Sequence, residues 1–142
     1  MTSSGAEVPI GRLVLDTSAY SWMRSGHAGV LDLVAGAEIV ILTATVLGEL
    51  EGGFELGSRQ GENRAALAEF MTEPFVRVRH VTPDTARRYG KVFAQLRNAG
   101  TPIPVNDMWI AATTLECGGH LLTFDAHYRH VPGLAATVLE PA

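Results

Sequence analysis

The sequence predicts an α/β fold in which helices flank a mainly parallel central sheet, giving three layers. Short apolar segments alternate with longer segments of helical spacing, and this alternation is typical of strand–helix–strand units. The strand segments are continuous apolar runs, as expected for parallel strands that are buried on both faces. Helix-capping residues follow several of these runs directly, so short connections from strand to helix are expected.

The first strand and the first helices are predicted close to the start of the chain. Residues 12–15 form a short apolar run that ends in the capping residues 16–18, Asp-Thr-Ser. A strand followed by a helix is therefore expected. The helical pattern continues over residues 30–34 and stops near Gly36.

A second strand–helix unit follows. Residues 38–42 (EIVIL) are short and rich in β-branched side chains, which predicts a buried strand. Thr43 and Thr45 can cap the next helix, which we expect to run through residues 49–50 and to be loosened by the glycines at 52 and 53.

A helix and an edge strand are predicted in the middle of the chain. Residues 59–71 have helical spacing, with Leu67, Phe70 and Met71 on one side. Residues 75–81 alternate between arginine or phenylalanine and valine, which predicts an edge or half-exposed strand.

The longest predicted helix starts at residues 82–84, where a capping threonine precedes a proline and an acid. It ends at residues 98–100, Asn-Ala-Gly. We expect one buried stripe along it, formed by Ala86, Tyr89, Phe93 and Leu96.

The remaining elements complete the alternation. Residues 105–117 predict a helix that stops at the glycines 118 and 119, and residues 120–123 predict a strand. A turn or short helix at 126–130 and a last strand at 137–139 follow. In parallel sheets of this kind, functional residues gather at the carboxyl ends of the strands.

Composition sets limits on the class of protein. The chain has 142 residues, 46% of them hydrophobic, with a mean hydropathy of +0.14, which suits one domain with a sizeable core. We expect a flexible tail at residues 1–10 and a single domain over 11–142. The single cysteine, Cys117, cannot form an internal disulfide, and we expect it to be a buried thiol.

Charge and hydropathy argue against two further classes. The formal net charge of −4 argues against a simple nucleic-acid-binding module, which normally carries a basic surplus. The longest uncharged stretches run for ten residues, as at 39–48, too short to span a membrane. The first ten residues lack the basic start and apolar core of a signal peptide, so we expect a cytoplasmic protein.

Four carboxylates follow strands or begin helices in this outline: Asp16, Glu49, Asp107 and Asp125. In a parallel sheet they can converge at one edge, where they would repel one another unless cations neutralised them. Carboxylate oxygens are the ligands that Mg²⁺ prefers, and two such ions about 3.5–4 Å apart can clamp a phosphate and activate water.

Each acid by itself also has a structural interpretation. Asp16 can be a helix cap, and Asp107 can be stabilised by the dipole at a helix start. Glu49 can lie on a solvated helix face with Glu51 and Glu55, although Val46, Leu47 and Leu50 place it nearer the apolar side. Asp125 can be an ordinary turn residue.

Three stretches resemble the PIN-domain ribonucleases, and specifically the VapC-like toxins of bacterial toxin–antitoxin pairs. LVLDTSAY (13–20) is similar to the family's first strand and first acid, and LTATVLGELEGG (42–53) to the helix with its second acid. TPIPVNDMWIAATTLECGGHLLTFDAHYRHVPGL (101–134) is the most specific match. The resemblance extends from about residue 13 to residue 139 and implies a PIN-like fold.

The resemblance implies metal-dependent hydrolysis of RNA. Asp16, Glu49, Asp107 and Asp125 would bind Mg²⁺ or Mn²⁺, with Asp16 and Asp107 as direct ligands. Glu49 would orient or deprotonate the attacking water, and Asp125 would act partly through water. Thr17, Ser18, Asn106 and Thr123 match polar positions around those acids. Water would attack the phosphorus in line and leave 5′-phosphate and 3′-hydroxyl ends.

The chain departs from the family pattern after Asp125. Many relatives have Asp-Phe where this chain has His127 and Tyr128. The departure removes an acid that helps to hold a second metal, so the number of ions, one or two, stays open. His127 is interpreted as a surface turn residue, with a weak metal or substrate contact as the alternative.

The family also implies partners. RNA contacts are assigned to Arg24, Arg59, Arg64 and Arg129, with a solvated surface role as the alternative for each. Relatives work as homodimers and are neutralised by a cognate antitoxin whose tail enters the acid pocket. Trp22 and Trp109 lie near Asp16 and Asp107 in the sequence, and each is either an interface anchor or part of the core.

Other functions are weighed against this one. A phospho-accepting receiver domain also has acids at strand ends, but it would show an adjacent acidic pair and a lysine near the last strand, and this chain has neither. A housekeeping PIN nuclease and a catalytically inactive PIN-like RNA-binding module are the closer alternatives. The four intact acids argue against the inactive module.

Overall fold

The computed structural model describes residues 10–141, so residues 1–9 of the expected N-terminal tail lie outside the described part. Its five strands form one sheet in the order β4-β3-β2-β5-β6, and all four neighbouring pairs are parallel. The strands are β2 (Arg12–Leu15), β3 (Ile39–Thr43), β4 (Val76–Arg79), β5 (His120–Thr123) and β6 (Ala136–Val138). The predicted α/β fold with a mainly parallel sheet is confirmed.

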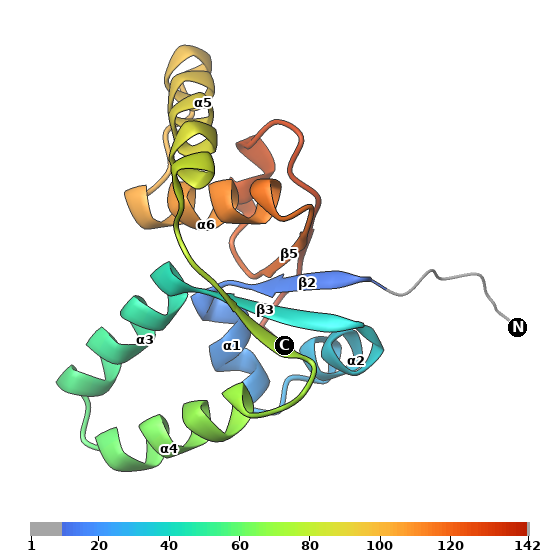
Figure 1. The fold of residues 1–142 in the computed structure, drawn as a ribbon, viewed down its shortest axis with the longest axis vertical. Helices are drawn as coiled ribbons and strands as arrows, with labels where there is room; N and C mark the ends of the chain where they lie inside the picture. Colours follow the sequence, from blue (N-terminus) through green and yellow to red (C-terminus); the bar gives the residue numbers. More distant parts are fainter. Residues whose placement is uncertain (1–9, 142) are drawn as a thin grey trace, which may run out of the picture.

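Helices cover the two faces of this sheet (Figure 1). The first four connect β2 to β3 and β3 to β4 and lie on one side: α1 (Thr17–Arg24), α2 (Ala28–Gly36), α3 (Ala44–Leu56) and α4 (Gln60–Met71). α5 (Pro83–Ala99) and α6 (Val105–Glu116) connect β4 to β5 and lie on the other side. Crossovers between parallel strands are right-handed, so the helices change face when the chain reverses its direction across the sheet.

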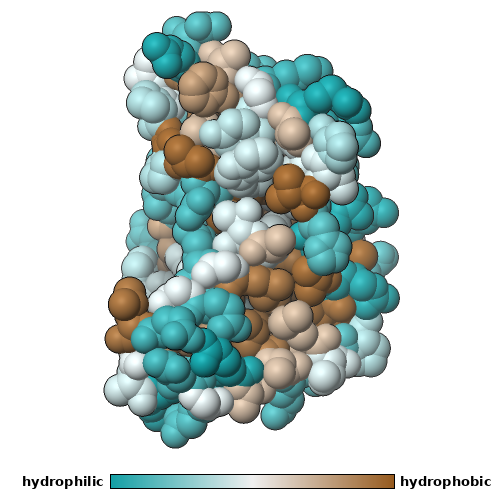
Figure 2. All heavy atoms as spheres, turned by 60° about the vertical axis from the view of Figure 1, so that its left-hand side comes forward, coloured by the Kyte–Doolittle hydropathy of each residue, from teal (hydrophilic) through white to brown (hydrophobic). Residues whose placement is uncertain are grey.

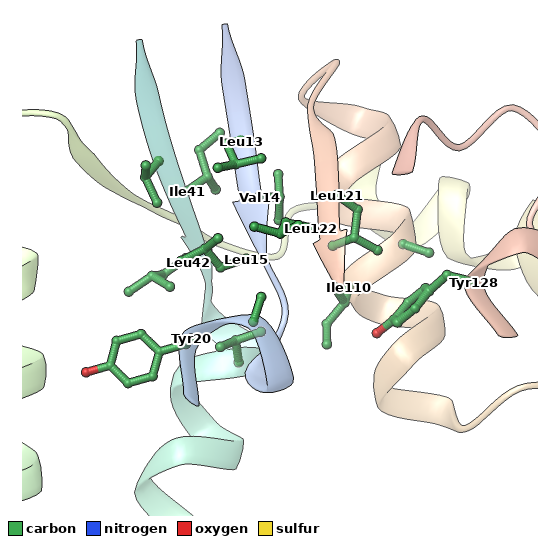
Figure 3. Packing of buried hydrophobic residues seen from close by; sticks show 14 of the residues in the cluster. Leu13, Val14, Leu15, Tyr20, Ile41, Leu42, Ile110, Leu121, Leu122 and Tyr128 are labelled. Carbon is green, nitrogen blue, oxygen red and sulfur yellow. The ribbon is translucent and has the colours of Figure 1, made fainter. Parts of the chain in front are cut away.

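The core lies on both faces of the central strands. Leu13, Val14 and Leu15 of β2 are fully buried, as are Leu121 and Leu122 of β5. Figure 3 shows these side chains packed with Ile41 and Leu42 of β3 and with Ile110 of α6. Burial on both faces explains why the strand segments read as continuous apolar runs.

The strand order reverses between β2 and β5. The chain passes from β2 outward to β3 and β4 and then returns to β5 on the other side of β2. Leu15 pairs with Leu122, so Asp16 and Thr123 stand next to each other at the carboxyl ends of the two strands. Ligand sites in open α/β sheets form at such a reversal, because the flanking connections leave in opposite directions there.

Two details differ from the sequence prediction. The stripe predicted for α5 is wrong at two positions, because Thr85, Val92 and Leu96 are buried while Ala86 and Phe93 are exposed. Thr82 and Thr85 form a capping box, and the Thr85 hydroxyl also donates to Glu116 of α6 at 2.9 Å, which turns this side of the helix inward. In addition, α3 continues past Gly52 and Gly53 to Leu56.

No helix within residues 10–141 combines the length and the apolar character that crossing a membrane requires.

Candidate functional site

Asp16 lies at the end of β2 and is the N-cap of α1. Its Oδ1 accepts hydrogen bonds from the backbone N–H of Ala19 at 2.8 Å and from the Ser18 hydroxyl at 2.7 Å, and its Oδ2 accepts one from Thr123. The residue is only 5% exposed. Burial raises the pKa of Asp16, although these hydrogen bonds oppose the shift, and the nearby charge of Asp107 raises it further.

Glu49 is held by polar side chains from two other helices. The Thr17 hydroxyl of α1 donates to Glu49 Oε1 at 2.6 Å, and the Asn106 amide of α6 donates to Oε2 at 3.3 Å. Glu49 itself lies in the second turn of α3 and is half-buried. The three helices that carry these residues therefore meet at the carboxyl end of the sheet, with Glu49 between them.

Asp107 and Asp125 are linked by one imidazole ring. Asp107 lies in the first turn of α6, and its Oδ2 is 2.6 Å from His127 Nε2. Asp125 caps the 3₁₀ turn η1 (Ala126–His130), and its Oδ1 is 2.7 Å from His127 Nδ1. The Asp125 backbone N–H also donates to the Thr123 hydroxyl at 3.0 Å, which ties this turn to Asp16.

These contacts overturn the interpretation of His127 as a surface turn residue. Its side chain is 25% exposed and both ring nitrogens face carboxylates, whereas the Asp125 side chain is 52% exposed. Asp125 caps this turn, and its Oδ1 accepts a hydrogen bond from the His127 backbone N–H at 3.4 Å. The turn directs the His127 side chain toward Asp107. The spacing Asp-x-His was the sequence signal for this arrangement.

In the sequence, Tyr128 is part of the departure from the family pattern, but no local pattern indicates that it belongs to the site. It is 1% exposed, and its hydroxyl is the one buried side-chain polar atom in residues 10–141 without a hydrogen-bond partner. Figure 3 shows the ring entering the core beside Ile110. Burial raises the pKa of Tyr128, and the charges of Asp107, Asp16 and Glu49 raise it further, so the phenol is a neutral donor that faces these acids.

This set of residues suits a divalent cation. Asp107, Asp125 and His127 each offer a ligand atom, and these atoms lie within 4.8 Å of one another. The hydroxyl of Tyr128 is buried without a hydrogen-bond partner among the described residues, and its closest acid neighbour is Asp107. Carboxylate and imidazole groups are metal ligands, and a cation would relieve the repulsion between the acids.

The arginines predicted to contact RNA differ in their surroundings. Arg64 bonds through Nε to Glu51 at 2.7 Å and through Nη2 to Glu55, and Arg59 pairs with Glu62 at 3.2 Å. These pairs are exposed on α3 and α4. Arg24 is exposed at the end of α1, and Arg129 is exposed on η1, two residues after His127.

The two tryptophans and the cysteine pack within the chain. Trp109 stacks on Tyr89 with ring centroids 4.1 Å apart, and Trp22 stacks on Phe124 at 5.5 Å. Both tryptophans are half-buried, and Trp22 packs against the hydrophobic core, which agrees with the core alternative for that residue. Cys117 is buried, as expected.

A groove of about 200 Å³ lies between α1, α3 and α4, lined by Tyr20, Arg24, Leu50 and Phe54 among others. In Figure 2, apolar side chains gather in the lower half of the molecule, the part that contains these helices. Leu56, at the end of α3, is 92% exposed.

Comparisons with known proteins agree with this architecture. The PIN domain family model matches residues 13–134. Ribonuclease VapC5 of Mycobacterium tuberculosis is 27% identical over 123 residues, which cover 87% of this chain and 90% of that protein.

Two solved structures show the same fold. One is VapBC2 from Rickettsia felis bound to a DNA fragment from its promoter, with a TM-score of 0.78 and 20% identity over 89% of this chain and 98% of that one. The other is VapC20 of Mycobacterium tuberculosis, described as a toxin that cleaves the sarcin–ricin loop. Its TM-score is 0.61, with 22% identity over 84% of this chain and 95% of that one.

Proposed function

Because this chain belongs to the PIN domain family, we propose that it is a divalent-metal-dependent endoribonuclease and the toxin of a VapBC-like toxin–antitoxin pair. The observation that supports the proposal is the group formed by Asp107, Asp125 and His127, whose ligand atoms lie within 4.8 Å of one another beside the reversal of strand order. Hydrogen bonds through Thr123 and Asn106 connect this group to Asp16 and Glu49. The similarity to ribonuclease VapC5 along 87% of the chain supports the ribonuclease activity. Mg²⁺ and Mn²⁺ are the ions that this set of acids favours.

We assign the roles from the contacts of each residue. Asp16 and Asp107 would hold the ion directly, and the Thr123 and Ser18 hydroxyls orient the Asp16 carboxylate for this role. Glu49 orients the attacking water or takes its proton, and Thr17 and Asn106 hold its two oxygens. Asp125 lies at the edge of the site and positions the His127 ring there. When bound, a divalent ion supplies charge neutralisation and a more acidic water.

The groove between α1, α3 and α4 supports a protein partner. Solved structures of this fold include VapBC-1 of Haemophilus influenzae and a toxin–antitoxin complex from Klebsiella pneumoniae. Tyr20, Leu50 and Phe54 line the groove, with Arg24 at its edge, so it suits an apolar segment with an acidic residue. We propose that a VapB-like antitoxin binds there and that a second copy of the chain forms a homodimer.

The substitution Asp16→Asn tests the activity. We expect the purified parent chain to cleave single-stranded or looped RNA with Mg²⁺ or Mn²⁺ and to stop when EDTA is added. Asp16→Asn keeps the cap acceptor for Ala19 but removes the charge, so cleavage should fall by at least about a hundredfold. Gel analysis of RNA ends measures both rates, and circular dichroism checks the fold.

Expression in cells tests the toxin role with the same pair of proteins. The parent chain should arrest growth and Asp16→Asn should not. Co-expression of the product of a neighbouring small reading frame should relieve the arrest. Equal cleavage by both proteins at equal purity would contradict the assignment of this chain as a nuclease. Cleavage of RNA without growth arrest would instead favour a housekeeping PIN nuclease.

A further inference from the structure

His127 brings an imidazole ring among the acids of the site. Its ring lies between Asp107 and Asp125, at 2.6 Å from Oδ2 of the first and 2.7 Å from Oδ1 of the second. The ring is held from its backbone as well, because the His127 N–H donates to Asp125. The imidazole is therefore placed by the fold and is not a mobile surface group.

The two contacts of the ring cannot be equivalent when the imidazole is neutral. A neutral ring has one N–H and one lone pair, so it donates to one carboxylate and presents its lone pair to the other. Asp125 is the more exposed partner and lies on the same turn, which suits it to accept from Nδ1. Nε2 then presents a lone pair toward Asp107, and a cation shared with that carboxylate satisfies both groups.

This pattern occurs around protein-bound metals. A histidine ligand commonly donates its second ring N–H to a carboxylate, which fixes the tautomer and orients the ring. Here Asp125, 2.7 Å from Nδ1, is positioned to be that carboxylate, which would leave Nε2 as the ligand nitrogen beside Asp107. The hydroxyl of Tyr128 is buried without a hydrogen-bond partner among the described residues and lies near Asp107, so it is one more polar group available to an ion or water held by these acids.

We propose that His127 binds the catalytic ion through Nε2 beside Asp107, and that this nitrogen makes the site prefer Mn²⁺ or another first-row transition ion to Mg²⁺. The inference rests on the proposed function and names the ion class of that site. Mg²⁺ is a hard ion that binds oxygen and keeps its waters, whereas transition ions accept imidazole nitrogen readily. A site made only of carboxylates offers no nitrogen ligand, so it has no such reason to prefer Mn²⁺ to Mg²⁺.

Metal binding, measured without RNA, tests the proposal. Isothermal titration gives the Mn²⁺ and Mg²⁺ affinities of the parent chain, of His127→Asp and of a control, His130→Ala. His130 is an exposed histidine on the same turn. We expect His127→Asp to lower the ratio of Mn²⁺ to Mg²⁺ affinity by about tenfold, and His130→Ala to leave that ratio unchanged.

Pulsed electron paramagnetic resonance of bound Mn²⁺ gives a second readout, which the parent chain alone can decide if His127→Asp does not fold. The parent chain and His130→Ala should show coupling of the Mn²⁺ electron spin to a directly bound nitrogen nucleus, and His127→Asp should lose it. Absence of this coupling in the parent chain, or an unchanged affinity ratio in His127→Asp, overturns the proposal. Because neither measurement uses cleavage, an inactive chain that binds Mn²⁺ through nitrogen contradicts only the proposed nuclease function.

Discussion

Asp16 shows how one side chain can serve both a helix and a functional site. Oδ1 caps α1 through Ala19, while Oδ2 accepts the Thr123 hydroxyl across the strand boundary. The structural and the functional interpretations of this residue therefore do not exclude each other. The pKa of Asp16, raised by burial, indicates that its negative charge is disfavoured in the ion-free chain. Such local destabilisation is common where a fold prepares a binding site.

Tyr128 allows a test at the scale of one hydroxyl group. In the ion-free chain the hydroxyl is buried without a partner, and such a group is destabilising. We expect Tyr128→Phe to keep or raise the free energy of unfolding, by up to about 1 kcal/mol. If the hydroxyl donates to a group bound among the acids, the same change should lower kcat for RNA cleavage by about tenfold with little change in KM.

Chemical denaturation and steady-state kinetics measure these two effects. Tyr89→Phe is the matched control, because Tyr89 is a half-buried tyrosine on α5 that stacks on Trp109, outside the acid cluster. It should leave kcat unchanged. A marked loss of stability in Tyr128→Phe would show that the hydroxyl has a partner in the folded chain, and would contradict the expectation.

The acids of the site were predictable from the sequence, but their connections were not. Parallel strands end at one edge, so Asp16 and Asp125 had to lie near each other once their strands were located. The link through His127 depends on the turn at Asp125, which directs the ring toward Asp107. Side-chain direction in a turn follows from tertiary contacts that local spacing does not encode.

Among the elements, the strands were predicted best. β2 and β5 have the bounds expected from their apolar runs, because burial on both faces leaves few polar positions within them. α5 was located correctly, but the buried side of the helix was not. Ala86 and Phe93 fit the helical period as well as Thr85 and Val92 do, and the packing against α6 decides between them.

The edge of the sheet formed by β5 and β6 should be sensitive to pH. His120 of β5 lies 2.7 Å from the Thr137 hydroxyl of β6, and burial lowers the pKa of His120 below 6.5. The unfolded chain therefore binds this proton more readily than the folded chain does. Stability from this group is complete above about pH 6.5 and decreases as the pH falls from there toward the lowered value.

Replacement of His120 isolates that contribution. The melting temperature of the parent chain should fall further between pH 7.5 and pH 5.5 than that of His120→Gln, which keeps a polar group near Thr137 but does not titrate. Asp16 and the other acids are present in both proteins, so their effects cancel in the comparison. An equal fall in both proteins would contradict a lowered pKa for His120.

For the whole molecule, the excess of acidic over basic residues is explained by the acids of the site. The formal net charge of −4 argues against a simple nucleic-acid-binding module. The four site acids carry as many negative charges as the whole surplus of 15 acids over 11 bases, and one bound divalent ion would bring the net charge to −2 and two ions to zero. Contact with phosphate through a metal does not require a basic surface, so the acidic balance is compatible with an RNA substrate.

Metal binding should therefore stabilise the entire domain. An ion that binds the folded chain alone adds about 2.7 kcal/mol at a hundred times its Kd, which for a domain of this size is a rise in melting temperature of about 5–10 °C. Thermal unfolding with and without Mn²⁺ measures the rise, and EDTA should reverse it.

General screening of the acids by salt would raise the melting temperature too, so NaCl of equal ionic strength is the first control. Asp107→Asn is the second, because it removes the carboxylate that the structure places against both His127 and Tyr128. If NaCl reproduces the rise, or if Asp107→Asn keeps it, the four acids do not form a specific cation site, and the metal-dependent mechanism fails with it.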